Sequence, residues 1–346
     1  MALIRSQARH DVLRSSRCLT RAETGVHRNY SHDNTIQSGC KRPSVAWDSP
    51  IDGGLTFGLS SEAVSFLVPL AELADITLIG SFRKDSTFVN GLDPHEKYLL
   101  QKLKAVRQAK LIPKPPTIHV SQWAPGSLWK TKLREYGPGD DVYRISRAMY
   151  EATHVPADWI PNFNEIDEWW VPFKGMKEIL VQNHGLSPDR IHVVEEGLDT
   201  DRTFNPALFD HRLSRQRVYP THVQNSHIFL SVFKWEERKA YKELIKAFAF
   251  AFPAGENVTL FLRTNPPQDI GTVVKDILGH EDLRIQILSR QDDHRYQQMI
   301  AGADVFVLAS HGEGWRRPLL DAMAMGRPVI ATNWSGPTQF VTVSSS

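Results

Sequence analysis

The chain has 346 residues, of which 41% are hydrophobic and 23% are charged, and its formal net charge at pH 7 is +2. This length suffices for two ordinary domains, and the composition excludes a fibrous or wholly disordered chain. The small net charge argues against a dedicated nucleic-acid-binding protein. No run of about 18 apolar residues occurs, which argues against a membrane span and leaves at most peripheral membrane contact.

The first 42 residues differ in composition from the rest of the chain. They are rich in arginine and serine and lack the apolar stretch of a secretory signal, so we expect a disordered extension or an organelle-targeting segment. The only cysteines, Cys18 and Cys40, lie in this segment. They exclude a disulfide framework or a cysteine metal site in the core and indicate a reducing compartment, so we expect a cytoplasmic protein, which includes the cytosolic face of a membrane.

Residues 43–205 alternate between short apolar runs and helical periodicity. The pattern predicts strands at 44–51, 75–82, 117–123, 142–152, 168–172 and 191–198, helices at 59–73 and 174–185, and a glycine turn at 52–58. Strands separated by helices predict a mostly parallel sheet with both faces covered. We interpret this part as a doubly wound α/β domain.

A second domain of the same kind is predicted after a polar, poorly periodic stretch. We interpret that stretch, residues 206–226, as an interdomain linker. Beyond it the pattern predicts strands at 227–235, 257–265, 283–290, 304–310 and 328–333, and helices at 241–252, 270–280, 292–303 and 318–326. Two doubly wound domains, 43–205 and 227–346, would face each other across a cleft at the carboxyl ends of their strands.

The segment HGEGWRRPLL, residues 311–320, follows a predicted strand and therefore lies at this cleft. Pro318 suits the first turn of a helix, whose unpaired N–H groups and dipole favour an anionic ligand group. We expect the Glu313 carboxylate to accept hydrogen bonds from hydroxyls, as on a sugar. Asp321 would either reach a ribose or only complement the helix dipole.

A basic cluster follows the first strand of the second domain. Lys234, Arg238 and Lys239 lie in the turn before a predicted helix. Ammonium and guanidinium donors in such a turn suit a diphosphate, while the alternative is a solvated charged turn.

Together these features resemble the retaining, nucleotide-sugar-dependent glycosyltransferases of the GT-B fold, group 1 (family 4). The resemblance spans residues 44–341 and is strongest in YRISRAMYEATHVPADWIPNFNEIDEWWVP, VVEEGLDTDRTFNP, FLSVFKWEERKAYKELIKAF and the segment that begins at His311. It implies two Rossmann-like domains, the first binding the acceptor and the second the donor. It also implies transfer of a sugar from a nucleoside diphosphate sugar to a hydroxyl of a carbohydrate, glycolipid or other acceptor, with retention of configuration. The donor is a substrate, and neither a cofactor nor a metal is implied.

The resemblance also assigns roles to individual residues. The catalytic candidates are Lys234, Lys239, Glu313 and His119. The donor-binding candidates are Gly53, Gly54, Arg238, Gly314, Trp315, Arg316, Pro318, Leu319 and Asp321. Gly53 and Gly54 match the family's glycine turn after the first strand, for which the alternative is an ordinary tight turn. His119 would lie beside the reacting sugar or serve only as a structural strand residue.

Several residues depart from the family pattern. Arg316 stands where the family has a second glycine, Ala240 replaces the glycine after the phosphate-binding lysine, and Gln339 replaces an acid. Asp321 is one methylene shorter than the expected glutamate. If the position of Arg316 needs a positive φ, the side chain adds about 1 kcal/mol of strain and intrudes into the donor site.

The family pattern continues beyond Val341 with further strands and helices, so the resemblance implies an incomplete second domain. These departures leave a second hypothesis open, a catalytically weakened relative that binds a nucleotide or sugar or serves as an interaction partner. A nicotinamide-dependent oxidoreductase is disfavoured because no G-x-G-x-x-G follows the first strand.

Overall fold

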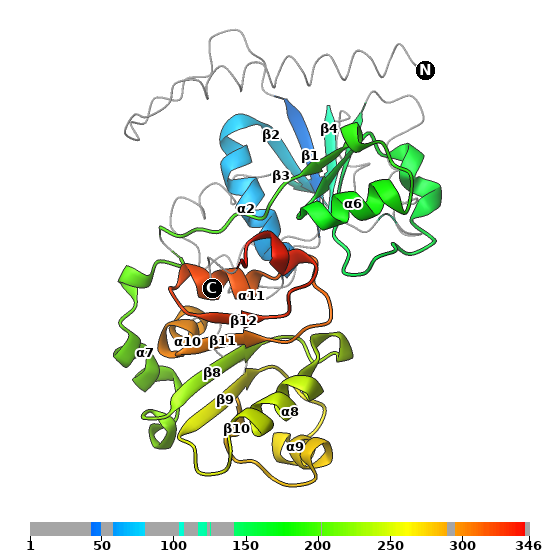
Figure 1. Ribbon diagram of the computed structural model, residues 1–346. Helices are drawn as coiled ribbons and strands as arrows, with labels where there is room; N and C mark the ends of the chain where they lie inside the picture. Colours follow the sequence, from blue (N-terminus) through cyan, green and yellow to red (C-terminus); the bar gives the residue numbers. More distant parts are fainter. Residues whose placement is uncertain are drawn as a thin grey trace.

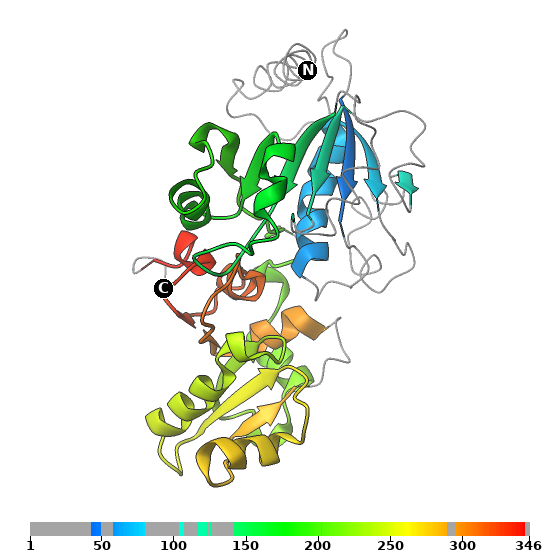
Figure 2. The ribbon, with the colours of Figure 1, turned by 90° about the vertical axis from the view of Figure 1, so that its right-hand side faces the viewer.

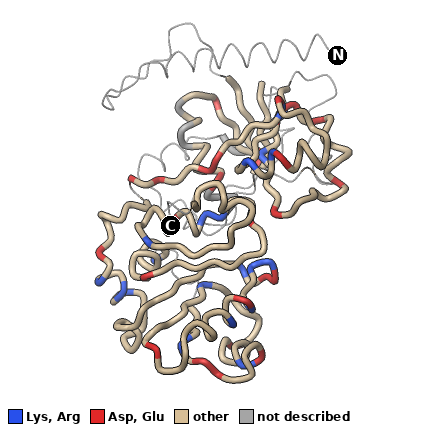
Figure 3. The backbone as a smooth tube through the Cα atoms, in the orientation of Figure 1, with Lys and Arg blue, Asp and Glu red and all other residues tan. Residues whose placement is uncertain are grey.

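The computed structural model describes residues 43–49, 58–79, 104–106, 117–122, 125, 142–201, 203–288 and 295–342. These residues form two α/β units stacked one above the other (Figures 1 and 2). Each unit is built on its own parallel sheet. Acidic and basic residues are interspersed along both units, with no single sign of charge dominating either (Figure 3).

The first sheet has seven strands among the described residues, in the order β3-β2-β1-β4-β5-β6-β7. The strands are β1 (Ser44–Asp48), β2 (Asp75–Ile79), β3 (Lys104–Val106), β4 (Ile118–Ser121), β5 (Tyr143–Arg147), β6 (Glu168–Val171) and β7 (Ile191–Val193). Helix α2 (Gly58–Leu73) leads from β1 to β2, and α6 (Lys174–Gln182) leads from β6 to β7. Every pairing is parallel. The strand order reverses between β1 and β4.

The second sheet has the order β10-β9-β8-β11-β12, and its described pairings are also parallel. Its strands are β8 (His227–Val232), β9 (Val258–Arg263), β10 (Ile285–Ile287), β11 (Val305–Leu308) and β12 (Val329–Ala331). The helices are α7 (His211–Val218), α8 (Tyr241–Ala251), α9 (Ile270–Leu278), α10 (Tyr296–Gly302) and α11 (Arg317–Ala324). The strand order reverses between β8 and β11. The predicted pair of Rossmann-like α/β domains is therefore confirmed.

Alternation along β8 explains why helices cover both faces of the second sheet. Ile228 and Leu230 belong to the core cluster that includes residues of α10 and α11. Phe229 packs on the opposite cluster, with Phe233 and residues of α8 and α9. Because successive side chains of a strand point to opposite faces, each face buries its own apolar layer.

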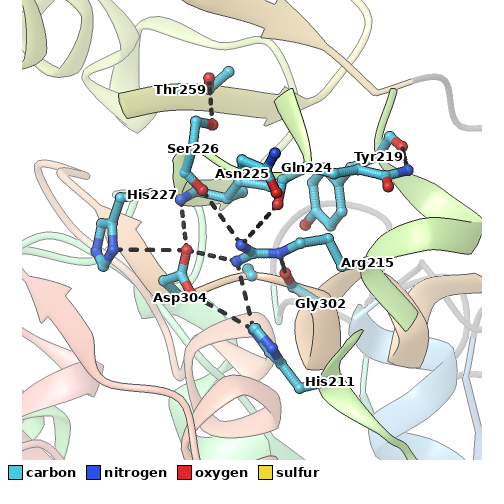
Figure 4. Close-up of polar contacts among 12 residues, drawn as sticks. His211, Arg215, Tyr219, Gln224, Asn225, Ser226, His227, Thr259, Gly302 and Asp304 are labelled. Carbon is cyan, nitrogen blue, oxygen red and sulfur yellow. Dashed lines mark hydrogen bonds and ion pairs between the residues drawn. The ribbon is translucent and has the colours of Figure 1, made fainter. Parts of the chain in front are cut away.

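The stretch predicted as a linker contains a helix that packs against the second domain. Helix α7 lies against α10, and the buried Tyr219 just after it donates a hydrogen bond from its hydroxyl to the carbonyl of Met299 at 2.7 Å. Arg215 of α7 ion-pairs with Asp304 at the start of β11, at 2.5 Å (Figure 4). Composition concealed this helix because five of its eight residues, HRLSRQRV, are basic or amide-bearing. Leu213 and Val218 are its only apolar residues, too few to show a helical period.

The two domains meet through the turn before α11. Trp315 is 3% exposed and packs on Phe340, with ring centroids 5.0 Å apart, within the core cluster of the first domain. A Cβ on Gly314 would come within 2.8 Å of the Met149 sulfur, so this position needs glycine for the domains to approach. Gln339 donates to Glu195 at 2.6 Å, where the family's acid would place two carboxylates together.

Candidate functional site

The candidate site lies where the second sheet reverses its strand order. The loop after β8 carries Arg238 and Lys239, and the loop after β11 carries Glu313. Because β8 and β11 are parallel neighbours, both loops leave the sheet at its carboxyl edge and diverge there. This edge faces the first domain (Figure 1).

Glu313 is the centre of a cluster of cations. Its carboxylate is 5% exposed and accepts hydrogen bonds from the Lys239 ammonium at 2.9 Å on each oxygen. Arg316 donates to Oε1 through Nη1, and Arg238 lies 3.2 Å from Oε2. The backbone N–H of Glu313 donates to the Ser335 hydroxyl at 2.8 Å. Both oxygens of the carboxylate therefore contact positively charged groups.

Burial and like charge shape the pKa values in this cluster. Burial, together with the charge of Arg316, lowers the pKa of Lys239 to about 8 in spite of Glu313. Burial also lowers the pKa of Arg316 to about 10. For Glu313 burial alone would raise the pKa, but the charges of Arg316 and Lys239 outweigh it and lower the pKa. The buried cations outnumber the buried carboxylate, so an anionic ligand group would complement the cluster.

Both departures from glycine lie in left-handed backbone. Arg316 has φ 86° and ψ 66°, immediately before α11, and Ala240 has φ 51° and ψ 40°, immediately before α8. Side chains with a Cβ are strained in this region. Arg316 therefore has the positive φ that was the condition for strain at this position.

Lys234 lies apart from the cluster. Its side chain is 75% exposed and pairs with Glu236 at 2.6 Å. In the same loop, Arg238 donates to the carbonyl of Gly312 at 2.7 Å and approaches Glu151 of the first domain at 3.3 Å. The structure thus brings Arg238 and Lys239 to Glu313, while Lys234 lies at the rim of the loop.

Asp321 lies in the second turn of α11. It is 5% exposed, and its Oδ2 accepts a hydrogen bond from the Tyr296 hydroxyl at 2.9 Å. Its Oδ1 is buried without a hydrogen-bond partner. Burial raises the pKa of this carboxyl to about 6. Pro318 lies in the first turn of α11, as expected.

Other predicted residues pack rather than face the cluster. Leu319 is fully buried in the core of the second domain, and Trp315 is buried between the domains. His119 is buried on β4, paired in register with Ala46 of β1 and Arg144 of β5. Gly53 and Gly54 lie outside the described residues.

A buried polar network lies at the carboxyl edge of the first sheet, and most of it was missed from the sequence. Arg147 pairs with Glu62 of α2 at 2.5 Å, and Glu62 accepts from Gln122 at 3.0 Å. Gln122 in turn accepts from the Trp47 indole at 2.9 Å. Glu62 falls within a predicted helix, and its contact with an arginine 85 positions away has no local signature. Ser335 and Tyr296 were missed for the same reason.

The described part of the chain contains neither a candidate metal cluster nor a candidate membrane span. No group of three or more His, Cys, Asp or Glu residues there is arranged to hold a metal ion. None of the helices in that part is both long enough and apolar enough to cross a bilayer.

Comparison with known families and curated proteins agrees with this geometry. Residues 224–344 match the family described as glycosyl transferases group 1. Mannosylfructose-phosphate synthase of Agrobacterium fabrum is 24% identical over 168 residues, which cover 46% of this chain and 36% of that protein. The match therefore spans only about a third of the length of that relative.

Solved structures share the two-domain fold. A glycosyltransferase from Rickettsia africae superposes with a TM-score of 0.64 at 16% identity, covering 86% of this chain and 80% of that one. HepE of Anabaena, solved in complex with UDP-glucose, superposes with a TM-score of 0.59 at 14% identity, covering 87% of this chain and 83% of its own. The expected GT-B fold is therefore confirmed, and the group 1 family match covers residues 224–344 of the chain.

Proposed function

We propose that this chain, whose second domain is of the glycosyl transferases group 1 family, is a retaining glycosyltransferase that uses a nucleoside diphosphate sugar. The observation that carries the proposal is the cluster at the β8–β11 reversal, where Arg238, Lys239 and the N-terminus of α11 surround one edge of the sheet. Cations and unpaired helix N–H groups at such an edge bind a diphosphate. The carbohydrate class of the ligand follows from the family.

The proposed reaction exchanges one glycosidic bond for another. The bond between the anomeric carbon and the diphosphate oxygen breaks, and a bond to the acceptor oxygen forms on the same face of the sugar. The acceptor hydroxyl proton passes to the departing phosphate oxygen, so atoms and charge balance. Lys239, Arg238 and the α11 N-terminus stabilise the negative charge that develops on the diphosphate, which is the main demand of such a step.

The acceptor would lie on the first domain, across the cleft from the cations. We propose a hydroxyl of a carbohydrate or glycolipid, since residues that follow β5 and β7 at the carboxyl edge of the first sheet contact Arg238 and Arg317 of the second domain. The buried network around Glu62 and Arg147 would give this wall a fixed shape. We further propose that the chain works in the cytoplasm.

A second candidate function is nucleotide binding without efficient transfer. It is favoured by Arg316, whose guanidinium occupies the Glu313 carboxylate in a strained backbone conformation. A site closed in this way would keep its affinity for a diphosphate and lose contacts with the sugar.

The test is a panel of UDP- and GDP-sugars with the full chain, scored for thermal stabilisation and for donor hydrolysis or transfer. Lys239→Ala should abolish both responses, because the variant removes the buried ammonium. Lys246→Ala, which changes an exposed lysine on α8, is the matched control and should respond as wild type does. Stabilisation without turnover would favour the second function, and no response to any nucleotide would refute both.

A further inference from the structure

Arg316 is held in an unfavourable backbone conformation by contacts of its guanidinium. It is 7% exposed, and its Nη1 donates to Glu313 while its Nη2 donates to the carbonyl of Val232 at 3.2 Å. A strained residue persists only where its surroundings fix it. Here the two ends of the guanidinium tie the turn before α11 to both Glu313 and the end of β8.

Three cations surround the Glu313 carboxylate in this arrangement. A carboxylate offers about four lone-pair positions on its two oxygens. Lys239 approaches both oxygens at 2.9 Å, Arg316 donates to Oε1, and Arg238 lies 3.2 Å from Oε2. Three of the four positions accept hydrogen bonds and the Arg238 guanidinium lies against the fourth, so a sugar hydroxyl could bind Glu313 only by displacing one of the three cations.

Of the three cations around Glu313, Arg316 is the one that a sugar hydroxyl would displace least easily. Arg238 also contacts Glu151, Glu236 and the carbonyl of Gly312, and about a third of its side chain is exposed, so it has alternative partners at the rim. Arg316 is buried, and its guanidinium donates to Glu313 and to the Val232 carbonyl. Leaving Glu313 would strand its charge in a buried position.

We propose that Arg316 is a specificity-determining residue that separates recognition of the diphosphate from recognition of the sugar. This inference rests on the proposed function. The cluster binds the nucleoside diphosphate through Lys239, Arg238 and the α11 N-terminus, while Arg316 keeps the Glu313 carboxylate from accepting a hydroxyl of a neutral hexose. A nucleotide sugar and its bare nucleoside diphosphate therefore bind equally well.

The experiment measures dissociation constants of the full chain by titration calorimetry for UDP and GDP and for UDP-glucose and GDP-mannose. In the wild type each sugar nucleotide should match its nucleoside diphosphate within about twofold. Arg316→Gly frees the carboxylate, and one hydrogen bond to a charged acceptor should then favour the sugar nucleotide by at least about tenfold. The double variant Arg316→Gly with Glu313→Ala should return the ratio to about one.

Arg316→Ala is a second test in case the glycine variant does not fold, because it removes the guanidinium and keeps the Cβ. A wild-type preference of tenfold or more for a sugar nucleotide would overturn the inference, as would an unchanged ratio in either Arg316 variant. If neither nucleoside diphosphate binds, the proposed function itself fails. The two failures are therefore distinguishable.

Discussion

Glu313 is a buried carboxylate that contacts three cations, so replacing it should lower the free energy of unfolding. Replacing it by glutamine leaves Lys239 and Arg316, both under one tenth exposed, without a buried counter-charge. Breaking a buried ion pair from one side costs about 3–5 kcal/mol. We therefore expect Glu313→Gln to lower the free energy of unfolding by about 3 kcal/mol at pH 7, measured by urea denaturation.

Glu236→Gln is the matched control for this variant. Glu236 lies in the same loop and pairs with Lys234, but a third of its side chain and most of the lysine are exposed. Exposed pairs contribute roughly 0–1 kcal/mol, so the control should lose less than about 1 kcal/mol. Equal losses for the two variants would contradict the buried cluster described here.

The lowered pKa of Lys239 predicts how nucleotide binding depends on pH. Burial and the charge of Arg316 bring this pKa to about 8 in the free protein, and a bound diphosphate would raise it by adding negative charge. The proton is then held more tightly in the complex than in the free protein. Affinity should be constant below pH 7.5 and fall above pH 8, by up to tenfold per unit.

The measurement is the dissociation constant of UDP or GDP between about pH 7 and pH 9.5. Lys239→Arg is the informative variant, because a guanidinium stays charged over this range and its affinity should not vary with pH. A wild-type constant that does not change up to pH 9.5 would show that Lys239 does not hold the diphosphate.

Asp304 is the acidic residue that attaches helix α7 to the second domain through Arg215. This carboxylate pairs with Arg215 at 2.5 Å and accepts from the backbone N–H of Ile228 at 2.7 Å (Figure 4). Burial alone would raise the pKa of Asp304, but these two hydrogen bonds and the nearby charges outweigh it and lower the pKa. The contribution of Asp304 is thus complete above its unfolded pKa of about 4 and lost as the pH falls through the lower folded value.

We therefore expect Asp304→Asn to cost about 2 kcal/mol of unfolding free energy at pH 7, the loss of hydrogen bonds to a charged group. The difference from wild type should shrink as the pH falls below 4. Urea unfolding at pH 7 and at pH 3 measures this difference. The control Asp276→Asn, which changes an exposed residue of α9, should not alter the free energy of unfolding. A difference that is equally large at pH 3 would exclude the ionised carboxylate as its source.

Elements with strong periodicity were predictable, and those stabilised by tertiary contacts were not. The predicted strand at 304–310 and helix at 318–326 correspond to β11 and α11 within a few residues, because alternation and a proline start mark them locally. No such local signal marks α7 or the three-residue β3. Helix α7 exists because Arg215 and Tyr219 find partners far along the chain.

The candidate site follows the same division. Glu313 and Lys239 were predictable because each follows a strand end at the carboxyl edge of the sheet. The mutual pairing of Arg316 and Glu313 was not, because it depends on the left-handed turn that brings the guanidinium back over the carboxylate. The same holds for Arg147 and Glu151, which pair with Glu62 and Arg238 on distant elements.

At the scale of the whole molecule, the two domains are joined through a contact that excludes water from charged groups. Arg317, the first residue of α11, donates to Glu196 at 3.2 Å and to the carbonyl of Gly197 at 3.1 Å. Glu196 follows β7 of the first domain and is 6% exposed. Glu62 of α2 and Arg147 of β5 contribute charges to its surroundings. This contact therefore couples the carboxyl edge of one sheet to a helix of the other.

The raised pKa of Glu196 predicts that the contact between the domains becomes less stable as the pH rises. Burial and the charge of Glu62 raise its pKa to about 8, although Arg317 and Arg147 oppose the shift. An acid whose folded pKa is raised holds its proton more tightly in the folded chain. Its contribution to stability is complete below the unfolded pKa of about 4.5 and is lost progressively as the pH rises toward 8.

Replacing Glu196 by glutamine mimics the protonated carboxyl and removes this dependence. We expect the unfolding free energy of the wild type to fall relative to Glu196→Gln between pH 5 and pH 8, by at most about 1.4 kcal/mol per unit. Glu62→Gln removes the repelling carboxylate, so the same window should move to lower pH in that variant. Parallel wild-type and Glu196→Gln profiles across this range would show that Glu196 is ionised in the folded chain, and that its contact with Arg317 is an ordinary ion pair between the domains.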